Sequence, residues 1–159
     1  MVKAADYIEN LAAAGQYHFS TADAQAVLGE SANAVRQALR RLIDKGQLAS
    51  PARGFYIIVP PEYRRLHCLP AEQFIPALMK QQNRLYYAAL LSAAQYYGAA
   101  HHRPQLFQVA VEKNRHSIKC GIVLVSFIAR KHIVDIPVRE FNTPRGTLRV
   151  STPEATALD

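Results

Sequence analysis

Amide and guanidinium side chains alternate at helical spacing in the first third of the chain. Asn33 and Gln37 lie four residues apart, as do Arg36 and Arg40, so each pair shares one side of a helix. An amide can form paired hydrogen bonds with adenine, and a guanidinium can form them with guanine, in the major groove of DNA. This spacing therefore indicates a helix face that can contact base edges. The full set of predicted DNA-binding residues is Ser31, Asn33, Arg36, Gln37, Arg40, Arg41, Lys45 and Arg53.

Three members of this set are better suited to phosphate than to bases. Arg41 and Lys45 lie toward the end of the helix, and Arg53 lies at the tip of a predicted hairpin, where cations contact the DNA backbone. The alternative is a solvated helix face, because basic and amide side chains cover the surface of many proteins. The neighbouring elements decide between these two interpretations.

Two short helices precede the polar face. Apolar residues recur at helical spacing between Ala5 and Ala12, and Gly15 can end this first helix. The second helix begins at Ser20, whose hydroxyl forms a capping box with Asp23 three residues later.

The third helix begins at Ser31 and ends at Gly46, and a hairpin follows over residues 47–59. Its apolar stripe lies opposite the cations and comprises Val35, Ala38, Leu39 and Leu42. Three helices and a hairpin within residues 1–59 predict a winged helix-turn-helix, which favours DNA binding over the solvated face.

Paired prolines at Pro60 and Pro61 mark the predicted start of a second domain, residues 60–159. Helices are predicted over residues 71–80 and 84–97, followed by strands over 106–112, 118–129, 133–138 and 147–151. Residues 122–125 are apolar in both phases of the pleat, which predicts a central strand covered on both faces. The fold class is therefore α+β: a winged helix-turn-helix followed by a mixed α/β sheet domain.

The last residues predict the start of another helix. Thr152 can cap it, Pro153 suits its first position, and Glu154 suits its first turn, yet the sequence ends at Asp159. We expect a fragment of a longer protein, with a helix fraying at a native terminus as the alternative.

Several function classes are disfavoured by what the sequence lacks. The longest apolar run, residues 122–129, is far shorter than the ~20 residues of a membrane span. Asp6 interrupts any signal peptide, and Cys68 and Cys120 are expected to be buried reduced thiols, which together indicate a cytoplasmic protein.

Enzymatic signatures are also missing. The six histidines lack the spacing of a zinc site, and neither a phosphate-binding glycine loop nor a GxSxG motif occurs. Glu112 and Asp135 are the only acids that suggest a metal-dependent nuclease, and two acids are a weak signal. We therefore predict no enzyme, no metal and no cofactor.

The net charge of +7 is unevenly distributed. Residues 1–59 hold six Lys and Arg against five Asp and Glu, whereas residues 60–159 hold thirteen against seven. Part of this excess could form one surface that extends the DNA contact, faces an acidic partner or is simply solvated. Its members are Lys113, Arg115, Lys119, Arg130 and Lys131.

Five segments in fixed order resemble a known family. They are residues 53–60, 86–94, 97–101, 107–109 and 151–159. Their order and spacing are similar to the AbiEi antitoxin family of type IV toxin-antitoxin systems. The resemblance implies a cytoplasmic bacterial regulator whose winged helix binds inverted repeats of double-stranded DNA in its own promoter. It also implies a C-terminal domain that opposes a co-encoded nucleotidyltransferase-like toxin, often without a stable complex.

The resemblance assigns the base-contacting role to the residues already predicted on the third helix, with Arg53 at the wing, and it assigns no catalytic residue. Family members usually continue into a helical segment beyond the Thr152–Glu154 motif, inside which this sequence stops. The alternative is a winged-helix regulator whose second domain binds a ligand or a protein, without a toxin partner. A nucleotidyltransferase-like gene overlapping the 3′ end would favour the antitoxin.

Overall fold

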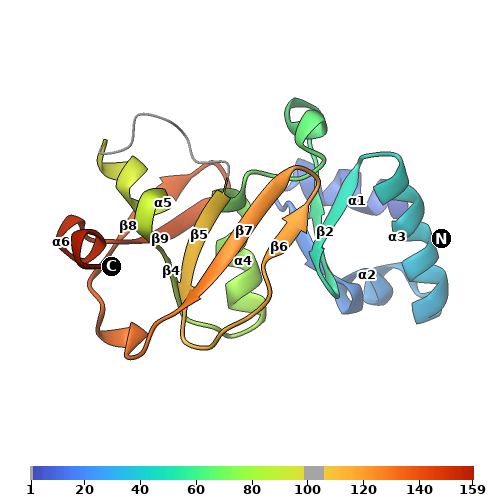
Figure 1. Ribbon diagram of the computed structural model, residues 1–159. Coiled ribbons are helices and arrows are strands. Elements are labelled where there is room, and N and C mark those ends of the chain that lie inside the picture. Colours follow the sequence, from blue (N-terminus) through green and yellow to red (C-terminus); the bar gives the residue numbers. More distant parts are fainter. Residues whose placement is uncertain (1, 99–105) are drawn as a thin grey trace. The chain divides into compact units, whose positions relative to one another are not determined.

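The computed structural model describes residues 2–98 and 106–159, and these form two compact units (Figure 1). The first unit comprises Met1–Pro70 together with Cys120–Ile122, and the second comprises Ala71–Lys119 together with Val123–Asp159. The sequence places the winged helix-turn-helix in residues 1–59, and the first unit continues beyond it through the 3-10 helix η1 (Pro61–Leu66).

The first unit combines three helices with a small antiparallel sheet, as predicted. The helices are α1 (Ala4–Ala13), α2 (Thr21–Leu28) and α3 (Ala32–Asp44). The sheet has the order β1-β3-β2, with β1 (His18–Ser20), β2 (Leu48–Ala52) and β3 (Phe55–Ile58). Only β1 was not predicted, because three residues are too few to show a periodic pattern.

The predicted helix caps are present. Ser20 Oγ accepts a hydrogen bond from the Asp23 amide at 3.1 Å, and the Asp23 carboxylate accepts one from the Ser20 amide at 3.0 Å. Gly29 ends α2 in the left-handed conformation, and Ser31 Oγ accepts from the Ala34 amide at the start of α3. These local bonds fix where both helices begin.

The core of the first unit lies between the helices and the sheet. Val35 and Leu39 of α3 are fully buried, and Leu42 is almost so. They pack in one cluster with apolar side chains of the other elements, whose larger members are Tyr7, Ile8, Phe19, Leu28 and Ile58. Phe19 of the short strand β1 contacts the Tyr7 ring edge-on at 5.2 Å and stacks on Tyr56 at 5.4 Å, so β1 is anchored by its one buried side chain.

The second unit contains a six-stranded mixed sheet with the order β6-β7-β5-β4-β9-β8. Its strands are β4 (Tyr86–Ala88), β5 (Leu106–Val111), β6 (Ile118–Cys120), β7 (Val123–Ala129), β8 (Val138–Thr143) and β9 (Gly146–Ser151). Helix α4 (Ala71–Gln81) contacts β9 and β7, whereas α5 (Leu90–Ala94) contacts β5 and α6 (Pro153–Leu158). The predicted mixed sheet domain is therefore confirmed.

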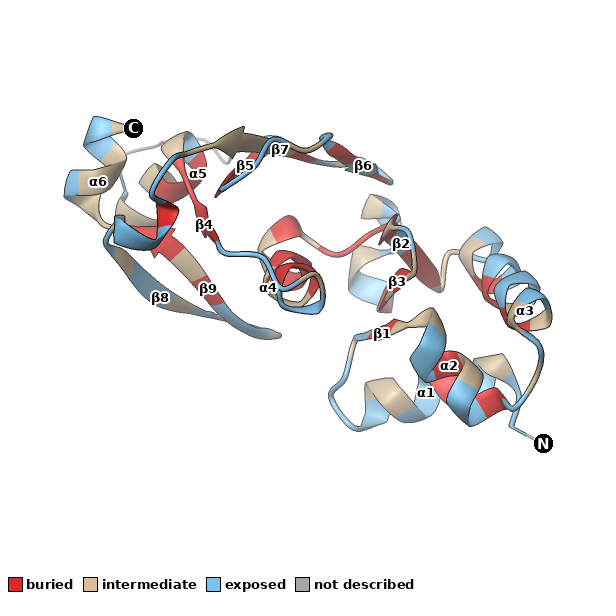
Figure 2. Cartoon of the chain, turned by 90° about the horizontal axis from the view of Figure 1, so that it is seen from below, coloured by how far each residue is buried: buried red, intermediate tan, exposed pale blue. Residues whose placement is uncertain are grey.

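The predicted helix over residues 84–97 is wrong. Tyr86–Ala88 form β4, which pairs antiparallel with β5 and parallel with β9, and only Leu90–Ala94 and the 3-10 helix η2 (Gln95–Tyr97) are helical. All three residues of β4 are buried (Figure 2). A short apolar run does not distinguish a buried strand from a buried helix, and pairing on both edges decides here for the strand.

Two predicted strands also differ. The strand over residues 118–129 is divided by a turn at Gly121 and Ile122 into β6 and β7, and residues 133–135 form a 3-10 helix, η3, ahead of β8. Ile122 is 64% exposed, so residues 122–125 are not the strand covered on both faces. The buried runs of the sheet lie instead in β4 and in β5, whose Val109, Ala110 and Val111 are buried.

The predicted C-terminal helix is present as α6. Thr152 Oγ1 accepts from the Ala155 amide, and Pro153 occupies the first turn. The carboxylate of Asp159 accepts from the Tyr87 hydroxyl at 3.3 Å and pairs with Arg130 at 3.6 Å. Burial, with the negative charge of Asp159, raises the pKa of Tyr87 to about 12, so the phenol remains a donor at neutral pH.

The turn between β6 and β7 returns the chain to the first unit. Both cysteines are free and buried, as predicted, but the sequence did not show that they meet. A hydrogen bond to Cys120 and burial raise the pKa of the Cys68 thiol, which stays protonated. The Ile122 amide donates to Leu66 O at 3.0 Å, and a Cβ at Gly121 would lie only 2.0 Å from that oxygen. Only glycine fits this close approach.

We predict that Leu39→Ala lowers the free energy of unfolding of the first unit by ~2–5 kcal/mol, because a fully buried leucine leaves a cavity. Val27→Ala on α2, where the side chain is 50% exposed, is the control and should change stability little. Hydrogen exchange measures the protection of backbone amides in each unit separately. We expect faster exchange in α1, α2 and α3 of the variant, and no equal increase in the six-stranded sheet of the second unit. An equal loss of amide protection in both units would contradict their independent unfolding.

Gly121→Ala should destabilise the first unit more than Gly15→Ala does. Both residues have positive φ, at +59° and +80°, so both variants lose ~1–2 kcal/mol through backbone conformation. Only Gly121 adds a clash with Leu66 O, since nothing lies within 4 Å of a Cβ at Gly15. Thermal unfolding of the two variants measures the difference, and equal losses would show that the turn can move away from Leu66.

Candidate nucleic-acid interface

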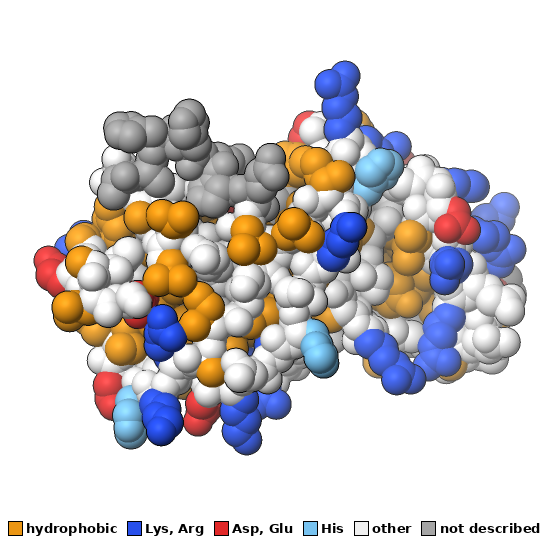
Figure 3. Space-filling model, viewed as in Figure 1, with side chains coloured by type: hydrophobic (Ala, Val, Ile, Leu, Met, Phe, Trp, Pro, Cys, Tyr) orange, Lys and Arg blue, Asp and Glu red, His pale blue; other side chains and the backbone are white. Residues whose placement is uncertain are grey.

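The predicted DNA-binding residues lie on the exposed surface of the first unit. Burial of the stripe through Val35, Leu39 and Leu42 turns the opposite side of α3 outward, and Lys and Arg side chains gather over this helix (Figure 3). Every residue of the predicted set is exposed: Ser31, Asn33, Arg36, Gln37, Arg40, Arg41, Lys45 and Arg53. One continuous helix therefore presents amides and cations together.

Most cations on α3 are available for a ligand. Arg40 pairs with Asp44 one turn later at 3.7 Å, and both side chains are largely exposed, at 78% and 68%. Such an exposed pair contributes little and can exchange for another partner. Within the described residues, Arg36 and Arg41 take part in no ion pair.

The N-terminus of α3 is held by Ser31. Its hydroxyl oxygen accepts from the Ala34 amide at 3.2 Å, and its O–H can still donate outward. The cap also fixes the direction in which the first turn of α3 leaves the loop after α2. Ser31 is therefore a positioning residue for the predicted base-contacting face as well as a candidate contact.

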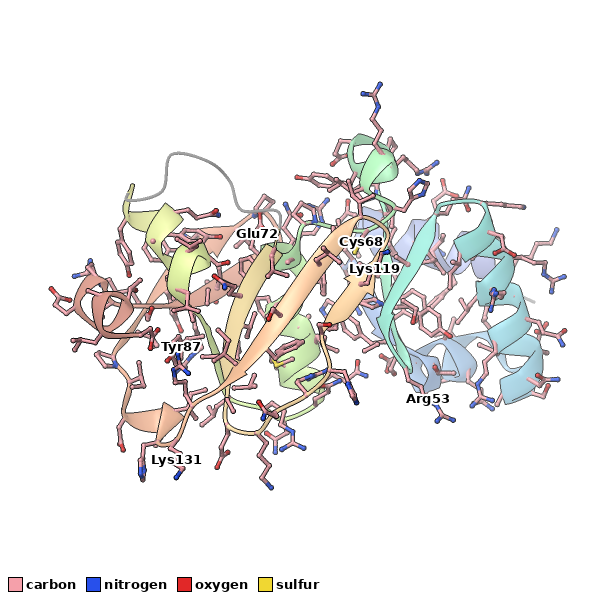
Figure 4. All side chains as sticks on the ribbon, in the orientation of Figure 1. Arg53, Cys68, Glu72, Tyr87, Lys119 and Lys131 are labelled. Carbon is pink, nitrogen blue, oxygen red and sulfur yellow. The ribbon has the colours of Figure 1, made fainter. Side chains whose placement is uncertain are left out.

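Arg53 lies in the turn between β2 and β3, at the tip of the hairpin (Figure 4). Ser50 Oγ donates to Ala52 O at 3.0 Å and to Phe55 O at 2.9 Å across this turn. The Thr21 amide at the start of α2 donates to Gly54 O at 3.2 Å. The wing tip is therefore tied to α2, which holds Arg53 in a defined position within the unit.

The cations of the second unit do not form the single surface suggested by the sequence. Val111 at the end of β5 pairs with Ala129 at the end of β7, which brings Lys113 toward the same end of the sheet as Lys131. Lys119 lies beside the start of β7, at the opposite end of a seven-residue strand (Figure 4). Seven residues span roughly 20 Å, so the length of β7 separates Lys119 from Lys131.

Enzymatic alternatives gain no support from the described residues. Glu112 and Asp135 are both exposed, the first in the loop after β5 and the second in η3. In residues 2–98 and 106–159, no group of three His, Cys, Asp or Glu side chains could hold a metal ion. No helix in that part of the chain is both long enough and apolar enough to cross a bilayer.

Comparison with known proteins identifies both parts of the chain. Residues 6–59 match a family model described as "Transcriptional regulator, AbiEi antitoxin", and residues 87–159 match one described as "AbiEi antitoxin C-terminal domain". No curated protein matches the chain. The first match begins within α1 and contains α2, α3 and the wing, and the second begins within β4.

Both matches agree with the family resemblance of the sequence and with the absence of an enzymatic signature. The chain belongs to the AbiEi antitoxin family of non-enzymatic transcriptional regulators, with the regulator domain at its N-terminus and the AbiEi C-terminal domain following it.

Proposed function

We propose that this chain is the antitoxin of a type IV toxin-antitoxin system and represses its own promoter. The observation that carries the proposal is the outward face of α3, where amide and guanidinium side chains lie at helical spacing within a unit that matches the family's regulator domain. Such a repressor acts in the cytoplasm, where bacterial DNA lies.

In this proposal α3 enters the major groove of double-stranded DNA. Asn33 and Gln37 form paired hydrogen bonds with adenines, while Arg36 and Arg40 form them with the N7 and O6 of guanines. Arg40 exchanges its exposed partner Asp44 for the base. The rigid caps of α2 and α3 hold these four side chains in one register, so the order of bases contacted follows the order of residues along the helix.

Backbone contacts complete the interface. Arg41 and Lys45 near the end of α3 neutralise phosphates at the edge of the groove, Ser31 donates from its N-terminus, and Arg53 contacts the backbone from the wing. The inverted repeats expected of the operator are contacted by two copies of the chain, because each half-site takes one recognition helix. Residues 1–59 would then bind DNA, and residues 60–159 would oppose the nucleotidyltransferase-like toxin without forming a stable complex with it.

A second candidate function rests on a recess in the second unit. An apolar cavity of about 510 Å³ is lined mainly by α5 and α6, including Leu90, Leu91, Tyr97 and Pro153. A cavity of this size and character can accept a small apolar ligand or a side chain of a partner protein. This would suit a winged-helix regulator that senses a ligand and has no toxin. Expression of the adjacent gene, alone and together with this chain, separates the two functions. Growth inhibition by that gene alone, relieved when this chain is also expressed, would favour the antitoxin.

Arg36→Ala and Arg40→Ala should each weaken binding to the promoter by ~1–3 kcal/mol and relax the preference for one base pair, because each removes a bidentate contact. Both side chains are exposed, so the fold should persist. Lys3→Ala removes an exposed cation from the start of α1 and serves as the control. Wild-type affinity in both arginine variants, measured by gel shift, would show that this face stays out of the groove.

Arg41→Gln should weaken binding to all duplexes alike, because a phosphate contact carries no base preference. For this variant, the slope of log K against log salt concentration should be shallower by ~0.9, because one phosphate is left unneutralised. Arg36→Gln, in contrast, should change the base preference. Titrations of promoter and unrelated duplexes at several salt concentrations separate the two effects, and an unchanged slope for Arg41→Gln would contradict its assignment.

A further inference from the structure

Two loops of the second unit lie side by side because of the β4–β5 register. Tyr86 at the start of β4 pairs with Val111 at the end of β5, so the loop that enters β4 must lie against the loop that leaves β5. Together these loops line a cavity of about 530 Å³. Its lining comprises residues 82–85 from the first loop, Val111 at the end of β5 and residues 112–116 from the second loop, and we call it the Arg84–Arg115 pocket.

The first loop is rigid because it ends α4 in a Schellman motif. The Arg84 amide donates to Met79 O at 2.9 Å, and the Asn83 amide donates to Lys80 O at 3.1 Å. Asn83 takes the left-handed conformation that this motif requires, with φ at 52°. The backbone of Arg84 is therefore fixed at the edge of the pocket, and only its side chain has to be ordered by a ligand.

The second loop contributes a half-buried guanidinium. Arg115 donates from Nη1 to Gln82 Oε1 of the first loop, and its Cζ lies 4.5 Å from the ring centre of Phe127 on β7. A guanidinium that lies over an aromatic ring and is bonded to an amide is held in place while several of its N–H groups remain available. Arg115 is thus held in advance of any ligand.

The charge of the pocket is not balanced. Arg84, Lys113 and Arg115 contribute three positive charges, and Glu112 contributes the one negative charge of the lining. Burial, and then the charge of Arg84, lowers the pKa of Arg115, so the two guanidinium groups repel each other. Among the described residues, neither arginine pairs with a carboxylate. An anion between them would remove this repulsion.

We propose that the Arg84–Arg115 pocket binds the phosphate group of a phosphorylated small molecule. Two guanidinium forks can grip the oxygens of one phosphate bidentately, which ammonium groups cannot do. The cavity volume is larger than a phosphate needs and falls within the range of small-molecule sites, roughly 300–1,000 Å³. Leu85, Val111 and the amides of Asn83 and Asn114 supply the uncharged lining that the rest of such a molecule would contact.

Titration of the full chain with three probes tests this proposal. Inorganic phosphate and adenosine 5′-monophosphate should both shift the amide NMR signals of residues 82–85 and 111–116 saturably at constant ionic strength, whereas adenosine should not. Arg84→Gln and Arg115→Lys should weaken phosphate binding by about ten-fold or more, the expected effect of one lost charge-assisted hydrogen bond. Arg139→Gln removes an exposed cation from β8 of the same unit and should bind like the wild type.

Stability gives a second, independent measurement. Without phosphate, Arg84→Gln should raise the midpoint of thermal unfolding, because it relieves the repulsion on Arg115. Added phosphate should then stabilise the wild type more than this variant. Promoter binding of Arg84→Gln should be unchanged, so the result stands apart from the proposed repression.

Three outcomes would overturn the proposal. Shifts that chloride reproduces at the same ionic strength would mean that the pocket has no preference for phosphate. Equal phosphate binding by the wild type, Arg84→Gln and Arg115→Lys would place the anion elsewhere. Signals of residues 82–85 that respond to duplex DNA but not to either phosphate probe would make the pocket a nucleic-acid contact instead.

Discussion

The arrangement of the first unit depends on the burial of one stripe of α3. Val35, Leu39 and Leu42 are spaced so that a single side of the helix faces the core, and the helix cannot rotate without moving a guanidinium into that core. The free-energy cost of an unpaired buried charge would exceed the small free energy of unfolding of the unit. The same packing that stabilises the unit therefore sets the direction of Asn33, Arg36, Gln37 and Arg40, and a face oriented in this way needs no rearrangement to meet a duplex.

In the second unit the comparable constraint is β4. Its three buried residues join the β6-β7-β5 part of the sheet to the β9-β8 part, since β4 pairs with both β5 and β9. The strand also aligns the loops on either side of it. The Arg84–Arg115 pocket at the start of β4 and the contact of Tyr87 with Asp159 both depend on the position of this short strand. A three-residue segment thus determines the surroundings of features that are distant in the sequence.

What the sequence could predict follows from how local the interactions are. The caps at Ser20 and Ser31 and the stripe on α3 involve residues three or four apart, so both the first unit's helices and the outward side of α3 could be predicted. By contrast, β1 and β4 exist because distant strands pair with them, and the register that brings Lys113 to the same end of the sheet as Lys131 is equally non-local. The placement of Arg84 and Arg115 on one pocket and the contact of Cys68 with Cys120 depend on such pairings, so neither had a signal in the spacing of residues.

The return of Cys120–Ile122 to the first unit makes that unit discontinuous along the chain. During synthesis the helices and wing can form once Ile58 has emerged, but the contact of Ile122 with Leu66 must wait for more than fifty further residues. The pairing of Ala88 with Val150 waits longer still. Until then β4, which contains Tyr86 and Tyr87, has an unpaired edge, and an unpaired strand edge is the kind of segment that associates with other unfinished chains. Chaperones that bind nascent chains would therefore be needed most by the sheet unit, while the helices of the regulator domain are already folded.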